Sequence, residues 1–217
     1  MARPPASAEA REQRFNQLLD AAVSRWLQHP ERVPSVAEVA DAAGLAKGTV
    51  YLYFKSKEDL LLAAHERHVQ AFFAALIARA SKRKRMNFDG MMQLTHEHID
   101  SVSAFLPLAT LVAGLMRKGV SPETAMAFEQ RMAERLGTAG ELLCNHFPLP
   151  DAASGVRLLM RSYALILGLW QLVGDCRPDC ANDEVSAMLR PDYTSELDAA
   201  LGALWQGTLN KEFSHAY

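Results

Sequence analysis

The residues best suited to contact a nucleic acid lie in one stretch, SVAEVADAAGLAKGTVYLYFKSKEDL, between Ser35 and Leu60. Ser35 and Glu38 have the spacing of a capping box, in which a hydroxyl and a glutamate satisfy the free amides at a helix start. Gly44 suits the left-handed residue that ends a helix. A second short helix, over residues 47–53, follows. The pattern predicts a helix-turn-helix, whose second helix enters the major groove with its N-terminus leading.

The same stretch is rich in lysine ammonium groups, in serine, threonine and tyrosine hydroxyls, and in glycines that leave the backbone accessible. Lysines and helix N-termini attract phosphate, hydroxyls hydrogen-bond phosphate or touch a thymine methyl, and a glycine lets DNA approach the backbone. A plain helical hairpin with solvated lysines is disfavoured, because only Val50 and Phe54 are evident core anchors on the second helix. The candidate DNA-binding residues are therefore Ser35, Lys47, Gly48, Thr49, Tyr51, Tyr53, Lys55 and Lys57.

The run A-x-x-A-G-L-x-K-G-T-V-Y-x-Y-F-x-S-K-E-x-L, from Ala40 to Leu60, resembles the signature of the tetracycline-repressor (TetR) family. The resemblance covers residues 11–68. It implies a homodimeric transcriptional regulator, usually a repressor, with a three-helix DNA-binding head and a C-terminal domain that dimerises and often binds an effector. It implies DNA contacts by six of the same residues: Ser35, Lys47, Thr49, Tyr51, Tyr53 and Lys55. Ala46 departs from the family, which often has a serine N-cap there, and the loss costs about 1 kcal/mol of helix stability.

The elements around this stretch are all predicted to be helical. Apolar residues recur at helical spacing from Glu9 to about His29, and Ser56 with Asp59 starts a long helix. Helical periodicity continues over residues 88–105, 106–118, 121–147, 152–173 and 194–212, with a loop over 174–191. The expected fold is all-α, a three-helix head on a bundle of five or six helices. The expected domains are a disordered leader (1–8), a DNA-binding domain (9–55), a connecting helix (56–85) and a C-terminal effector-binding and dimerisation domain (86–217).

Charge is unevenly distributed along the 217 residues. The net charge is −2, yet residues 1–85 hold 14 Lys and Arg against 9 Asp and Glu, while residues 86–217 hold 9 against 16. A basic first part suits a nucleic-acid module. The most apolar run, residues 163–173, is shorter than the ~20 residues that cross a bilayer. No signal-peptide pattern is evident, and we expect a cytoplasmic protein without a membrane segment.

Cysteines and histidines give weaker signals. Cys176 and Cys180, flanked by aspartates, suit a redox or metal site, but two plain loop cysteines are the favoured interpretation. His96 and His98 lie on opposite faces of a helix, and no ligand cluster accompanies His65 and His68, so no metal or cofactor is predicted. The run Lys82–Arg85 is interpreted as a solvated helix end, because ~38 Å of helix separates it from Ser56.

Two apolar sets are predicted in the C-terminal domain. The two helices over 152–173 and 194–212 carry a proposed dimer interface, with the single-chain core as the alternative: Leu165, Gly168, Leu169, Trp170, Leu172, Leu201, Leu204 and Trp205. A small apolar or amphipathic effector would be lined by residues that also suit an ordinary core: Phe105, Leu108, Leu111, Met116, Phe128, Met132, Leu143, Phe147 and Tyr163.

The sequence therefore predicts a repressor that binds a palindromic operator as a homodimer and is released by an effector. Two alternatives stay open. One is a DNA-binding regulator without a small-molecule effector. The other is a helical-bundle enzyme, which is disfavoured because no acid–base or metal cluster is evident.

Overall fold

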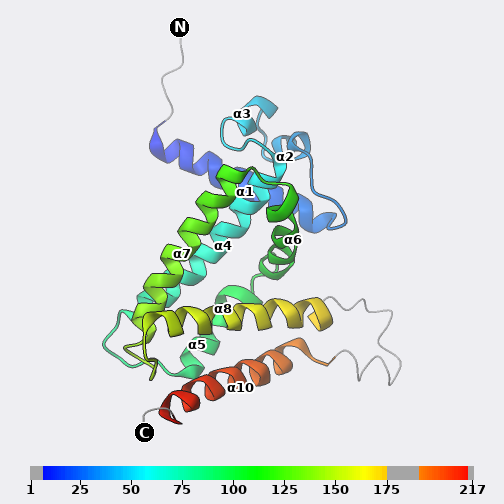
Figure 1. Cartoon of the computed structure of the whole chain (residues 1–217). Coiled ribbons are helices and arrows are strands. Elements are labelled where there is room, and N and C mark those ends of the chain that lie inside the picture. Colours follow the sequence, from blue (N-terminus) through cyan, green and yellow to red (C-terminus); the bar gives the residue numbers. More distant parts are fainter. Residues whose placement is uncertain (1–6, 175–190, 215–217) are drawn as a thin grey trace. The chain divides into compact units, whose positions relative to one another are not determined.

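The computed structural model describes residues 7–174 and 191–214, and within these ranges it contains helices and no strand (Figure 1). The loop cysteines Cys176 and Cys180 lie outside the described residues. Elements labelled η are π-helices. The bounds are α1 Ala8–Gln28, α2 Val36–Ala42, α3 Lys47–Tyr51, α4 Lys57–Ala80, α5 Phe88–Thr95, η1 His96–Asp100, α6 Phe105–Lys118, α7 Pro122–Leu143, α8 Ala152–Leu169, η2 Trp170–Gly174 and α10 Tyr193–Ser214.

The chain forms two compact units. The first consists of Met1–Val69 and Pro107–Phe128, and the second of Gln70–Leu106 and Glu129–Tyr217. The chain passes from one unit to the other within α4, α6 and α7. Each unit has its own buried apolar residues, as a compact unit requires.

The core of the first unit joins α1 to the helix-turn-helix. Leu18, Leu19 and Val50 are completely buried. The ring of Phe15 stacks on that of Phe54 at 5.1 Å, and the Gln17 side-chain amide donates to the Ala43 carbonyl at 2.7 Å. Gly44 has φ 64°, which a side chain would disfavour, and its left-handed turn sends the chain from α2 to α3. The predicted turn at Gly44 is thus confirmed.

The core of the second unit is centred on Trp205 of α10. This residue is 2% exposed, its ring meets those of Phe88 and Phe147 at 5.7 and 5.0 Å, and its Nε1 donates to Ser162 Oγ at 3.0 Å. Helices α8 and α10 lie side by side (Figure 1). Because α7 and α8 touch through Gly140 and Gly155, a Cβ on Gly155 would lie 2.7 Å from the Gly140 carbonyl oxygen.

Several helix boundaries differ from the sequence prediction. The helix expected over 88–105 becomes a π-helix at His96, where the Ser101 amide bonds the carbonyl five residues back at 2.9 Å, and it breaks before Phe105. The helix over 152–173 likewise ends as the π-helix η2. The expected helix over 47–53 ends at Tyr51, because the next two amides bond back only three residues. Helix α4 ends at Ala80, so Lys82–Arg85 follow the helix.

Candidate nucleic-acid interface

One groove of the first unit is formed by the start of α2, by α3 and by the start of α4. It is lined by Ser35, Val36, Ala37, Lys47, Tyr51, Lys55, Ser56, Lys57 and Glu58, and is called the head groove below. Five of the eight candidate DNA-binding residues lie on it. Its three lysines are exposed, and the only carboxylate in the lining, Glu58, lies 3.9 Å from Lys57 Nζ. The head groove therefore combines excess positive charge with hydroxyl donors, which suits a phosphate backbone.

The start of α2 is fixed by a reciprocal capping box. Ser35 Oγ accepts the Glu38 amide at 3.3 Å, and Glu38 Oε2 accepts the Ser35 amide at 2.8 Å, which confirms the predicted box. The Ser35 hydroxyl proton is not used in this bond, so it can be donated to a phosphate oxygen. The Ser35 side chain, which lines the head groove, is thus oriented by its bond to the first turn of α2.

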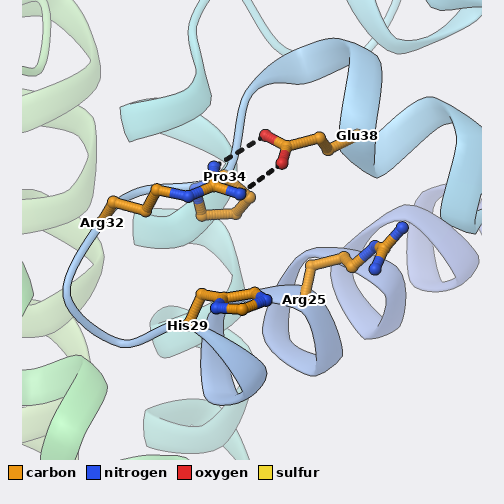
Figure 2. Close-up of a pocket in the computed structure, with 5 residues that line it drawn as sticks. All are labelled: Arg25, His29, Arg32, Pro34 and Glu38. Atoms are coloured by element: carbon orange, nitrogen blue, oxygen red, sulfur yellow. Dashed lines mark hydrogen bonds and ion pairs between the residues drawn. The ribbon is translucent and has the colours of Figure 1, made fainter.

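Arg32 extends this cap, a contact that the sequence analysis missed. Its guanidinium forms a two-pronged pair with Glu38, one of whose bonds, Nη1 to Oε2, is 2.9 Å (Figure 2). The hydrogen bonds from Arg32 and then from Ser35 hold the pKa of the Glu38 carboxyl well below its usual range. The pair is formed beside a hollow that Arg25, His29 and Pro34 also line (Figure 2). The carboxylate next to Ser35 is therefore charged but neutralised by Arg32.

The start of α3 presents open backbone. Ala46 is the N-cap and makes no side-chain cap bond, as the sequence predicted. Gly48 is exposed, and a Cβ built on it would meet nothing within 4 Å. Folding alone therefore does not require glycine at this position. A close approach of DNA to the backbone would require it.

The two tyrosines differ in their surroundings. Tyr51 is 51% exposed and lines the head groove. The Tyr53 ring instead packs toward α1, 6.3 Å from the Phe15 ring and with the Arg11 guanidinium 6.0 Å above it. The neighbouring Leu52 is 76% exposed, a feature that the sequence analysis did not single out. Tyr51 is thus the freer of the two rings.

The loop between α6 and α7 lies against the start of α4 in the same unit. A Cβ on Gly119 would lie 2.9 Å from Glu58 Cγ, and Glu58 lines the head groove. A displacement of α6 relative to α4 would therefore disturb the residues next to Lys57.

The apolar residues proposed for the dimer interface are not equally exposed. Leu201 and Trp205 are buried within one chain, whereas Leu172 is 77% exposed. The other five residues are half-buried, namely Leu165, Gly168, Leu169, Trp170 and Leu204. By length and composition alone, Ala152–Gly174 is long and apolar enough to cross a membrane, and 22% of its most apolar 18-residue window is buried. Much of this helix surface is therefore apolar but uncovered in one chain.

The residues proposed for an effector pocket fall in both units. Leu108, Leu111, Met116 and Phe128 belong to the first unit, and Phe105, Met132, Leu143, Phe147 and Tyr163 to the second. Phe105, Leu108, Leu143 and Phe147 are buried, and the others are half-buried. Burial raises the pKa of the Tyr163 hydroxyl to about 12.

The histidines have partners or burial of their own. His96 lies between two carboxylates, with Nδ1 3.3 Å from Asp100 and Nε2 2.9 Å from Asp198. Burial lowers the pKa of His65 to about 4. Among the residues that the structure describes, no group of three or more histidines, cysteines and carboxylates is placed to hold a metal ion.

A helix-turn-helix with a lysine-lined groove, followed by a larger helical region, defines the class of helical DNA-binding regulators. Residues 18–64 match the family model of bacterial regulatory proteins of the tetR family, and residues 66–212 match that of the tetracyclin repressor-like C-terminal domain. The chain therefore belongs to the TetR family of transcriptional regulators.

Among relatives, the chain is 37% identical over 59 residues to the fatty acid metabolism regulator protein of Bacillus subtilis (strain 168). That match covers 27% of this chain and 30% of the relative. The solved structure of the fatty acid degradation regulator FadR from Bacillus halodurans matches with a TM-score of 0.57 at 22% identity, covering 88% of this chain and 94% of that one. The structure of SmeT, the repressor of the Stenotrophomonas maltophilia multidrug efflux pump SmeDEF, matches with a TM-score of 0.53 at 19% identity. That match covers 91% of this chain and 89% of SmeT. These structural matches show the fold.

Proposed function

We propose that the chain is a cytoplasmic repressor that binds a palindromic operator as a homodimer through Ser35, Lys47, Gly48, Thr49, Tyr51, Tyr53, Lys55 and Lys57. The observation that carries this proposal is the head groove, where five of these residues share one cationic surface. Membership of a family of regulators, and not of enzymes, supports it further.

The residues divide into two kinds of contact. The three lysines and Ser35 contact phosphates, which positions the head but carries no sequence information. Gly48 and Thr49 lie in the leading turn of the second helix and the exposed Tyr51 is its last residue, and these three positions are the candidates to read base edges. Residues 1–60 hold eight basic and eight acidic side chains, so one head binds weakly and relies on placed lysines.

Two heads are required to make binding specific. A palindromic operator presents half-sites one DNA turn apart, about 34 Å, and a dimer must hold two heads at that spacing. The apolar surface of α8, η2 and α10 that one chain leaves uncovered, with Leu172 exposed and Leu204 half-buried, supports a subunit interface there. Leu201 and Trp205 are buried within the chain, so they would support the interface by packing under its surface residues and not by contacting the partner.

Release by an effector is the third part of the proposal. The effector would be a small apolar or amphipathic molecule, and the relatives named for fatty acid metabolism and degradation make a fatty acid the first probe. It must bind the released state more tightly than the DNA-bound state, since equal affinity shifts nothing. The packing of Gly119 on Glu58 supports α6 as the element that conveys the change to the head groove.

The test begins with the full-length protein and a random-sequence duplex library, from which repeated selection recovers the bound sites. We expect a palindrome with half-sites about one turn apart. Lys55→Gln should weaken binding and make it less dependent on salt, because one phosphate contact fewer releases fewer counterions. Lys84→Gln, which changes the same charge outside the head groove, is the control. Failure to recover any enriched site would contradict the proposal.

A further inference from the structure

The loop between α4 and α5 is closed by a buried histidine. His146 is 5% exposed, and its ring lies between the two ends of residues 81–85, called the basic loop below. Its Nε2 donates to the Ala80 carbonyl at 2.7 Å, and its Nδ1 accepts the Met86 amide at 3.1 Å. The ring thus uses an N–H at Nε2 and a lone pair at Nδ1, which is the combination that a neutral imidazole offers. The Arg85 Nε also donates to the His146 carbonyl oxygen at 2.9 Å, so the basic loop is fastened at both ends.

A hollow in the surface of the second unit lies beside the basic loop. It is lined by Ala80, Ser81, Lys82, Arg83, Arg85, Leu142, Asn145 and His146, and is called the basic hollow below. Every side chain in this lining that is charged at neutral pH is a cation, and Ser81 and Asn145 add neutral hydrogen-bond donors. A ligand that fits this lining must offer several acceptor oxygens and negative charge.

Within the described part of the chain, no carboxylate neutralises the charges of the basic loop, and Arg85 bonds a neutral carbonyl. Lys82, Arg83, Lys84 and Arg85 are exposed, and none of them forms an ion pair there. Residues 86–217, which follow the basic loop in the sequence, hold 9 basic against 16 acidic side chains. The four cations of the loop are thus a local concentration of positive charge next to an acidic part of the chain. A run of lysines after a helix is ordinarily just solvated. Here the bonds of His146 hold both ends of the loop backbone and Arg85 Nε is bonded to the His146 carbonyl, so less of the loop has to be ordered on binding.

We propose that the basic hollow binds a small polyphosphate group, that of a nucleoside di- or triphosphate or of pyrophosphate. Lys82, Arg83 and the free nitrogens of Arg85 supply charge-assisted hydrogen bonds, and Ser81 and Asn145 supply neutral ones. This site is separate from the head groove, and its existence does not depend on operator binding.

The experiment is calorimetric titration of the full-length protein with inorganic pyrophosphate and, separately, with ATP, at ionic strength held constant with sodium chloride. The decisive variants are Lys82→Gln and Lys84→Gln. Both remove one exposed lysine charge from the same loop, but only Lys82 lines the basic hollow. Arg85 is left intact because it bonds the His146 backbone.

We expect saturable binding of one ligand per chain, weakened about tenfold by Lys82→Gln or Arg83→Gln and less than about twofold by Lys84→Gln. Binding of ATP without pyrophosphate would still support the site and assign part of the affinity to the nucleoside. Equal weakening by Lys82→Gln and Lys84→Gln would overturn it, since diffuse charge would then explain the binding. Absence of saturation by both probes up to about 10 mM would overturn it too.

Discussion

The hydrogen bonds that shape the head groove and those that shape the second unit join residues at very different separations in the sequence. Around the head groove, the Ser35–Glu38 box and the bond from the Asp59 amide to Ser56 Oγ each join residues three apart. In the second unit, His146 bonds Ala80 across 66 residues, and Trp205 bonds Ser162 across 43. The head groove is thus built from local turn chemistry, whereas the C-terminal part depends on partners that only the complete fold brings together.

This difference separates two kinds of mutational effect. Exposed side chains of the head groove contribute little to folding, so changing them should alter DNA affinity at nearly constant stability. Buried residues of the second unit contribute to the fold itself, so changing them should lower stability first. The predictions below follow this contrast from the largest expected effect to the smallest.

Replacement of Trp205 by alanine should have the largest effect. The change removes two ring contacts and the bond to Ser162 and leaves a cavity, and we expect a loss of about 3–5 kcal/mol in the free energy of unfolding. Urea titration followed by circular dichroism measures it. Met126→Ala, at a 68% exposed position, should change stability by less than about 0.5 kcal/mol. A loss below about 1 kcal/mol at Trp205 would contradict its central place in the core.

A charge at Leu204 should separate the two subunits. Leu204 is half-buried in one chain, and an interface that covers it would bury an unpaired carboxylate in Leu204→Glu. We expect the dimer dissociation constant to rise more than about a hundredfold, equivalent to about 2.7 kcal/mol. Sedimentation velocity measures it, with Met126→Glu as an exposed control. An unchanged sedimentation profile would mean that the interface lies elsewhere.

His65 should make stability depend on pH, which tests how far the first unit shares the buried character of the second. Its pKa is about 4 in the folded chain and near 6.5 when unfolded, so the unfolded state binds its proton first as pH falls. Stability should thus be nearly constant above about pH 7.5 and should be about 2 kcal/mol lower at pH 5.

Urea titrations of the His65→Leu variant should lack this part of the pH dependence. His29→Gln, which removes a histidine with a 57% exposed side chain, should keep it. If both variants follow the pH profile of the native chain, the burial of His65 does not control its protonation.

Alanine at Gly48 should separate folding from DNA binding with the smallest change. A Cβ there meets nothing within 4 Å, and alanine favours a helix, so we expect stability to stay constant or rise by up to about 1 kcal/mol. Operator affinity should fall, because the methyl group would occupy the space that the proposed contact of Gly48 with the DNA backbone requires. Fluorescence anisotropy with a labelled operator measures it. Unchanged affinity would place the backbone of Gly48 away from the DNA.

The sequence predicted those features that depend on near neighbours. The capping box at Ser35, the left-handed turn at Gly44 and the missing cap bond at Ala46 were all predicted and are confirmed. These features depend on residue types a few positions apart, which one sequence displays. The all-helical fold followed from periodicity for the same reason.

The sequence did not predict features that depend on distant partners. Periodicity shows that one face of α10 is apolar, but it does not show that Trp205 is covered by its own chain. The π-helix at His96 was missed, because five residues in a wide turn keep an almost helical pattern. The packing of Tyr53 on Phe15 and Arg11 was missed too, since those partners lie 38 and 42 positions earlier in the printed sequence.

The central claim is that the head groove grips DNA, and Tyr51 tests it most directly. Tyr51 is 51% exposed, so Tyr51→Ala should leave stability and the dimer unchanged by urea titration and sedimentation. Titration of a selected operator at constant salt should show an affinity at least about tenfold lower than that of the native chain. Full retention of operator affinity by this folded, dimeric variant would contradict the claim.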